Sequence, residues 1–147
     1  MRYSLQQKKY AMGLLEKRAV KAFQDGSYKK LTDEINTLAG YPIEFEVKWD
    51  TLAVDEYSHI YEDGFTKVYF LPVIAAFKEI VSDEMGKEAL KETLKKIIIK
   101  NEGQIYYGSN AYSISDGVLT IDHQPCTNID DVTHRTNELT NLLMKQM

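Results

Sequence analysis

The segment from residue 68 to residue 101 constrains the fold more than any other part of the chain. It combines the most apolar helical pattern, a second helical pattern with clear start signals and a run of three isoleucines. Apolar residues recur at helical spacing over residues 70–81, and only Lys78 and Glu79 are charged between residues 72 and 81. A helix this apolar is buried on most of its sides. We therefore expect the rest of the chain to pack around this segment.

Pro72 leaves two starting points open for this helix. Proline has no N–H and suits a first helical turn, which favours a start near Leu71. In the alternative, the helix starts near Phe65 and Pro72 kinks it. The first interpretation makes residues 65–70 an extended connection.

A second helix and a strand follow directly. Asp83 is a good N-cap and would place Gly86 in the first turn, where glycine costs less than in the middle of a helix. The charges change from acidic at the start to Lys95 and Lys96 at the end, in agreement with the helix dipole. The three β-branched residues 97–99 predict a strand that is central or covered on both faces.

Two amphipathic helices are expected before this segment. Residues 4–24 carry apolar side chains at helical spacing, with Ser4 as a cap, and Asp25-Gly26 is predicted to end the helix. Residues 28–38 make the second helix. Residues 43–49 then alternate strictly between apolar and charged side chains, which predicts a strand with one buried face and Trp49 pointing inward.

Residues 111–123 predict a β-hairpin with Asp116-Gly117 as a two-residue type I′ turn. This turn pairs Tyr112 with Ile121, so that apolar side chains meet on one face. The outer face then carries Val118 amid small polar residues. A last helix is expected over residues 128–146.

These elements predict one α+β domain over residues 1–147. The expected architecture is an antiparallel sheet of about four strands with helices packed mainly on one face, in two layers, flanked by long N-terminal and C-terminal helices. No series of strands, helices and Gly-rich turns is present, which disfavours a doubly wound nucleotide-binding fold.

The composition limits the function classes. A net charge of −4 and a pI near 5.4 argue against nonspecific nucleic-acid binding. The single cysteine, Cys126, cannot form an internal disulfide and suits a reducing compartment. No apolar run is long enough for a membrane span, and the first residues lack the apolar core of a signal peptide. We expect a cytoplasmic protein without a cofactor that binds neither nucleic acid nor membranes.

The acidic and aromatic residues 55–63 could form a short helix or a loop. On a helix, His59 would share a face with Asp55 and Asp63, and carboxylates with an imidazole can bind a divalent metal. A solvated acidic turn with an incidental histidine is the favoured interpretation, because no second histidine is near. No metal site is predicted.

His123 and Cys126 form the second candidate site, with Tyr112 beside them in the hairpin register. A nucleophilic cysteine needs activation, for example at a helix N-terminus, and Cys126 lies just before the last predicted helix. A hydrogen-bonded histidine at the edge of the core is the commoner outcome. We therefore assign no catalytic residue and keep Tyr112, His123 and Cys126 as candidate ligand-binding residues.

The ten tyrosines suggest an interaction surface, because tyrosine combines apolar area with a polar tip. We expect a non-enzymatic interaction protein with an accessory, inhibitor or immunity-type role. Its partner is another protein or a second copy, bound through Val118 or through the Tyr106-Tyr107 loop. The alternatives are a small enzyme or ligand-binding protein near His123 and Cys126, and a metal-binding module around His59.

Overall fold

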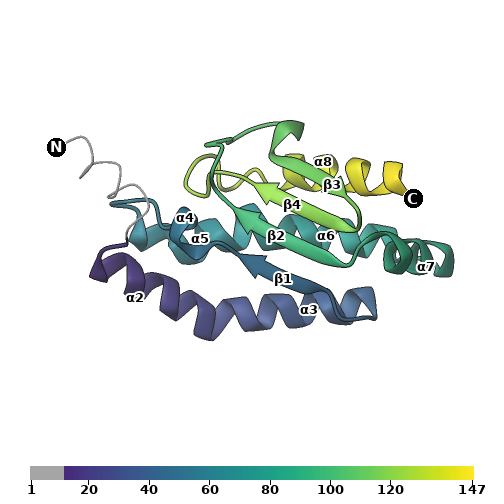
Figure 1. Ribbon diagram of the computed structural model, residues 1–147, viewed down its shortest axis with the longest axis horizontal. Coiled ribbons are helices and arrows are strands. Elements are labelled where there is room, and N and C mark those ends of the chain that lie inside the picture. Colours follow the sequence, from purple (N-terminus) through teal and green to yellow (C-terminus); the bar gives the residue numbers. More distant parts are fainter. Residues whose placement is uncertain (1–11) are drawn as a thin grey trace.

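The computed structural model describes residues 12–147. The predicted helix start at Ser4 lies outside these residues. The helices are α2 (Leu14–Phe23), α3 (Lys29–Ala39), α4 (Trp49–Leu52), α5 (Tyr61–Phe65), α6 (Leu71–Ile80), α7 (Glu84–Thr93) and α8 (Val132–Gln146). The strands are β1 (Glu44–Val47), β2 (Lys96–Lys100), β3 (Tyr112–Ser115) and β4 (Val118–Asp122). The predicted α+β class is confirmed (Figure 1).

The four strands form one mixed sheet in the order β1-β2-β4-β3. Strand β2 pairs in parallel with β1 and with β4, and β3 pairs antiparallel with β4. The predicted antiparallel sheet is therefore wrong. The helices between β1 and β2 return the chain to the end of the sheet where β1 begins, so both strands run in the same direction. The alternation of buried and wet side chains, which suggested the antiparallel sheet, does not by itself fix strand direction.

Two predictions about the strands are confirmed. The hairpin has the predicted register, with Tyr112 opposite Ile121. Asp116 and Gly117 both have a positive φ, +51° and +80°, as a type I′ turn requires. The isoleucine strand is central, because β2 lies between β1 and β4.

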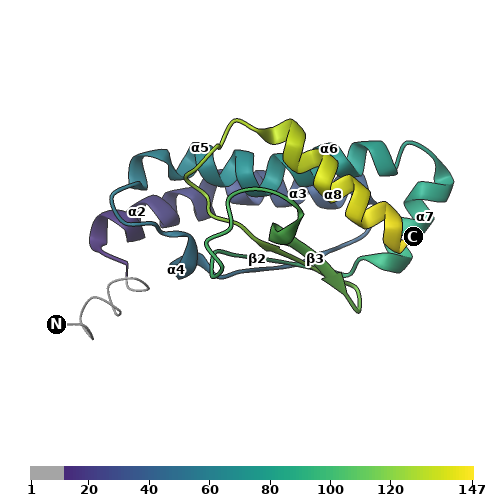
Figure 2. The same ribbon diagram turned by 90° about the horizontal axis from the view of Figure 1, so that it is seen from above.

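One face of the sheet meets the core, and we call the opposite face the open face. Figure 2 shows α2, α3, α5, α6 and α8 on one side of the sheet. The strand residues that alternate toward the core are Phe45, Val47, Ile97, Ile99, Tyr112, Ile114, Leu119 and Ile121. The open face carries Glu44, Glu46, Lys96, Ile98, Ser113, Ser115, Val118 and Thr120.

Residues 14–39 are helical throughout, so the predicted stop at Asp25-Gly26 is wrong. These two residues lie in a π-helical turn, Gln24–Tyr28, between α2 and α3. A π turn contains one residue more than an α-helical turn, so the side chains after it are rotated about the helix axis. The Tyr28 ring then packs edge-on against Trp49, with the centroids 5.0 Å apart. Packing of the aromatic side chains thus outweighs the local preference of Asp-Gly for a turn.

Residues 61–80 also form one run of helix. The preferred start near Leu71 and the extended connection over residues 65–70 are wrong, and the alternative start near Phe65 is closer to the structure. A second π turn, Thr66–Phe70, precedes Pro72, and Leu71 N–H donates to Thr66 O. The wider turn accommodates the proline, whose ring and missing N–H would strain a regular α-helix.

Strand β1 ends at Val47, so the strand predicted over residues 43–49 is too long. Trp49 begins α4 instead, but it still packs against the core, with its ring centroid 6.0 Å from that of Phe23. Among residues 12–147, no helix has both the length and the apolar character needed to cross a membrane.

Gly86 gives the first testable prediction. A Cβ at this position would lie 1.7 Å from the carbonyl oxygen of Ile80, so α7 would have to move away from the end of α6. We expect Gly86→Ala to lower the free energy of unfolding by about 1–3 kcal/mol, as other overpacked sites do. Denaturant titration measures the change.

Gly26→Ala is the matched control. It changes another helical glycine, but a Cβ there meets nothing within 4 Å. We expect it to raise the free energy of unfolding by about 0.4–1 kcal/mol, because alanine restricts the unfolded chain. Equal stability of the two variants would contradict the close approach at Gly86.

Candidate functional site

The order of the strands creates the candidate site. Because β4 lies between β2 and β3, the connection from β2 to β3 has to pass over the carboxyl end of β4. We call this connection, residues 101–111, the crossing loop. The N–H groups of Glu102 and Gly103 donate to Asp122 Oδ1 at 2.8 and 3.0 Å. The N–H of Gln124 donates to Ile105 O at 2.7 Å, so the loop is fixed to the end of β4.

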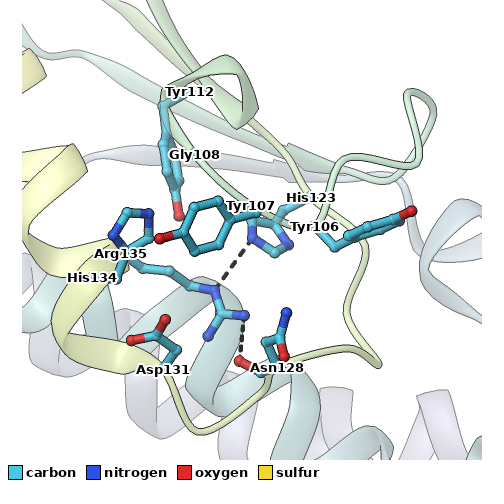
Figure 3. A pocket seen from close by; sticks show the side chains of 9 residues that line it. All are labelled: Tyr106, Tyr107, Gly108, Tyr112, His123, Asn128, Asp131, His134 and Arg135. Atoms are coloured by element: carbon cyan, nitrogen blue, oxygen red, sulfur yellow. Dashed lines mark hydrogen bonds between the residues drawn. The ribbon is translucent and has the colours of Figure 1, made fainter.

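The crossing loop, the end of β4 and the start of α8 enclose a small hollow, which we call the Arg135 pocket (Figure 3). It is lined by Tyr106, Tyr107, Gly108, Tyr112, His123, Asn128, Asp131, His134 and Arg135. Tyr107 covers one side, where its ring stacks on His134 with a centroid distance of 4.4 Å. The side chains leave no space large enough for a water molecule.

Arg135 lies at the base of this pocket and is only 2% exposed. Its Nε donates to His123 Nε2 at 3.2 Å, and Nη1 donates to Ile129 O at 3.2 Å. Its Nη2 donates to Thr127 O at 3.2 Å and to Asn128 O at 2.6 Å. Burial lowers the pKa of the guanidinium, which nevertheless stays charged. Every acceptor of these bonds is uncharged, and within residues 12–147 Arg135 forms no salt bridge with a carboxylate.

Arg135 also explains a difference from the predicted last helix. That helix was expected from residue 128 but begins at Val132. Asn128 has a φ of +52°, and its carbonyl turns to the guanidinium instead of entering the helix. The hydrogen bonds of Arg135 thus hold residues 127–129 as a loop at the edge of the pocket.

His123 is held in the neutral state. Its Nδ1 lies 2.7 Å from the carbonyl oxygen of Gln124, so Nδ1 carries the proton and donates it. Nε2 is then free to accept the hydrogen bond from Arg135. Burial lowers the pKa of His123 to about 4, and the nearby charge of Arg135 acts in the same direction. A protonated ring would place a second buried cation beside the first.

Two other polar atoms of the pocket are buried without a hydrogen-bond partner among the described residues. They are the Tyr112 hydroxyl and His134 Nε2. Tyr112 is only 7% exposed, and burial raises the pKa of its hydroxyl. His134 Nε2 is 3.9 Å from Glu138 Oε1, which is too long for a hydrogen bond. The pocket therefore contains one buried cation and two groups with unused hydrogen-bonding capacity.

The structure brings together four residues that the sequence singled out: Tyr106, Tyr107, Tyr112 and His123. Cys126 does not line the pocket. Val118 begins β4 at the other end of the sheet, on the open face, so the two predicted contact regions are far apart (Figure 1).

The structure shows no activation of Cys126 as a nucleophile. Burial raises the pKa of its thiol to about 11. Both ring nitrogens of His123 are engaged with Gln124 and Arg135, so neither is left for the thiol. The N-terminus of α8 is also not adjacent to Cys126, because the 127–131 loop intervenes.

The three residues of the candidate metal site lie on different elements. Asp55 is in a turn, His59 is in the 3₁₀ turn Ser58–Ile60, and Asp63 is in α5. Asp63 pairs with Lys67 at 3.3 Å. Within residues 12–147, no three or more His, Cys, Asp or Glu side chains gather closely enough to hold a metal ion.

Sequence reasoning missed Arg135, Asn128 and Asp131 as site residues. A signal for Arg135 was present, because it lies four residues before Leu139 and therefore on the apolar stripe of its helix. A charged residue on such a stripe is almost never fully buried unless its charge is balanced or bonded. No comparable signal marks Asn128 and Asp131.

Comparisons of the chain with protein-family models, with curated proteins and with solved structures give no match. The function therefore has to be inferred from the geometry of the site.

His123 makes the stability depend on pH. A histidine in the unfolded chain has a pKa near 6.5, whereas the pKa of folded His123 is about 4, so the unfolded state takes up the proton first as the pH falls. This contribution is fully present above about pH 6.5 and is lost as the pH falls toward 4. Between about pH 7.5 and pH 5 we expect it to cost about 2 kcal/mol of unfolding free energy.

The variant His123→Gln tests this assignment, because glutamine can accept from Arg135 but does not titrate. Its free energy of unfolding should fall by about 2 kcal/mol less over the same pH interval than that of the wild type. His59→Gln, at an exposed histidine outside the pocket, is the control for the substitution itself. A wild-type slope in His123→Gln would show that His123 is not the titrating group.

Cys126 gives a separate prediction. Because its thiol pKa is raised to about 11, the native protein holds little thiolate. At about pH 8 we expect iodoacetamide to alkylate native Cys126 roughly 100-fold more slowly than the unfolded chain, in proportion to the thiolate fraction. Mass spectrometry over time gives both rates. Equal rates would restore Cys126 as a candidate nucleophile.

Proposed function

We propose that this chain is a non-enzymatic protein-interaction module with two layers, helices over a sheet, that binds its partner through the crossing loop. The pair Tyr106 and Tyr107 is the observation that carries the proposal. Their side chains are 53% and 63% exposed, although both belong to a loop that is fixed to the sheet. Exposed tyrosines on a fixed support are the residues that dominate many protein interfaces.

The crossing loop is organised before any partner binds. Asp122 holds its first residues, Ile105 packs against the core, and Tyr107 stacks on His134 with an interplanar angle of 3°. A surface that is already ordered loses less conformational entropy on binding. This supports recognition by a loop whose backbone stays in place when a partner binds.

The chemistry near the loop favours binding over catalysis. The raised thiol pKa of Cys126 and the fully bonded ring of His123 do not support nucleophilic catalysis. The separation of Asp55, His59 and Asp63 among three elements gives no support to a metal-binding module. An accessory, inhibitor or immunity-type role in the cytoplasm fits a free cysteine and a net charge of −4, and we propose no cofactor and no nucleic-acid or membrane partner.

A second copy of the chain is the simplest partner, because closed twofold dimers are the commonest assembly. Two surfaces could form the contact. The crossing loop is one of them. The other is the open sheet face around Val118, next to the edge strand β3, which contains no lysine or proline that would block strand pairing.

Light scattering on single variants tests the proposal, because the two surfaces lie at opposite ends of the sheet. We expect the wild type at micromolar concentration to have twice the monomer mass of 16.9 kDa. Tyr107→Lys should return the mass to that of the monomer, because it puts a charge at the centre of the contact. Val118→Lys should leave the dimer intact.

Met85→Lys is the control, since Met85 is 82% exposed on α7 at the other end of the molecule. It should not affect association. Loss of the dimer in Val118→Lys alone would move the contact to the open sheet face and contradict the role of the loop. If the wild type is monomeric, affinity capture with the same variants replaces scattering, and a partner retained by Tyr107→Lys would contradict the proposal.

A further inference from the structure

We propose that the Arg135 pocket is a binding site for a single carboxylate group. The inference rests on the proposed function in one respect only: the carboxylate would belong to an acidic side chain or to the C-terminus of the bound protein. The site itself follows from the charge, burial and hydrogen bonding of the residues in Figure 3.

The first argument is the charge of Arg135. The side chain is 2% exposed, and all its described hydrogen-bond acceptors are carbonyl oxygens or a neutral imidazole. A buried cation is costly unless an anion balances it, and the nearby Asp131 carboxylate, which forms no salt bridge with Arg135, offsets this charge only in part. These four bonds use four of the five N–H groups of the guanidinium and leave one Nη1 hydrogen. An anion in the pocket would accept a hydrogen bond from this Nη1 hydrogen and would balance the positive charge of the guanidinium.

The second argument is independent of Arg135. The Tyr112 hydroxyl and His134 Nε2 are both buried and have no partner among the described residues, and both belong to the lining of the same pocket. Figure 3 shows the Tyr112 hydroxyl directed inward, toward Tyr107 and His134. The hydroxyl can donate one hydrogen bond, and the imidazole can donate from Nε2. Two buried donors thus share the lining of the pocket with one cation, and this combination suits an oxyanion.

The charged neighbours select a monoanion. Arg135 is the one fixed cation in the lining of the pocket, whereas the Asp131 carboxylate also lines it and Glu138 lies 3.9 Å from His134. A phosphate would bring about two negative charges at neutral pH against a single guanidinium and would face Asp131. A carboxylate carries one charge and has two oxygens, one for Arg135 and one for the Tyr112 hydroxyl.

Tyr107 controls entry. The pocket has no free space while the Tyr107 ring lies on His134, so the ligand has to displace this ring. Tyr107 is 63% exposed, so its ring can swing toward solvent without opening the core. Stacking on the imidazole would then be exchanged for packing on the partner.

Sodium acetate is the probe, titrated at constant ionic strength against sodium chloride and followed by amide NMR shifts of Tyr107, Gly108 and Asn128. We expect saturable shifts with a millimolar dissociation constant for acetate, and none for chloride. Inorganic phosphate should bind more weakly than acetate. Absence of saturable acetate binding would overturn the proposal, and tighter binding of phosphate would overturn the assignment to carboxylate.

Tyr112→Phe is the decisive variant, because it removes only the unpartnered hydroxyl and leaves the fold intact. We expect it to weaken acetate binding at least fivefold, with thermal stability equal to or above that of the wild type. Tyr41→Phe is the matched control: its hydroxyl donates to Leu90 O and Leu94 O, away from the pocket, and its loss should not change acetate binding. Unchanged acetate binding in Tyr112→Phe would overturn the site.

The two proposals can fail separately. If acetate binds and is lost in Tyr112→Phe, but Tyr107→Lys has no effect on association, the carboxylate site stands and its ligand is a free small molecule. If association depends on Tyr107 and acetate does not bind, the protein interface stands and the carboxylate site is refuted.

Discussion

The position of β4 between β2 and β3 is the constraint on which the rest of the candidate site depends. It forces the chain to leave β2, pass over the carboxyl end of β4 and enter β3 at the edge of the sheet. The crossing loop is the result, and its hydrogen bonds to Asp122 and Gln124 hold it at the end of β4. Because β4 continues into His123 and then into α8, the same end of the sheet receives the loop, the histidine and the start of the last helix. The pocket is therefore a product of topology more than of any one motif.

The parts of the fold that could be predicted are those set by local chemistry. The hairpin needs only the positive φ of Asp116 and Gly117 and the match of apolar residues across the turn. The central strand needs only a run of β-branched residues. Part of the site followed from the same reasoning, since the register placed Tyr112 and His123 on the inner face of the hairpin. Tyr107 was singled out only because the chain is rich in tyrosine.

The parts that could not be predicted depend on contacts distant in sequence. Asp25-Gly26 and Pro72 are ordinary signals for a helix boundary, but each lies in or beside a π turn of a helix that continues because its aromatic side chains are buried. Strand direction could not be predicted, because the alternation of apolar and polar residues indicates which face of a strand is buried and not which way the strand runs. Arg135 was missed because its partners are backbone carbonyls and the ring of His123, twelve residues away, and no sequence pattern marks a carbonyl as an acceptor.

The electrostatics of the pocket couple folding to binding. Arg135 holds residues 127–129 and donates a hydrogen bond to His123, which burial keeps neutral, so its hydrogen bonds are needed for the local structure. Those bonds satisfy donors but have only uncharged acceptors, and the Tyr112 hydroxyl, which has no partner within residues 12–147, costs about 1–3 kcal/mol more. The Tyr112 hydroxyl is not needed for packing, because phenylalanine would fill the same space. A carboxylate ligand would balance the charge and pair the hydroxyl in one step. It would therefore bind the folded state alone and stabilise the protein increasingly as its concentration rises above its dissociation constant.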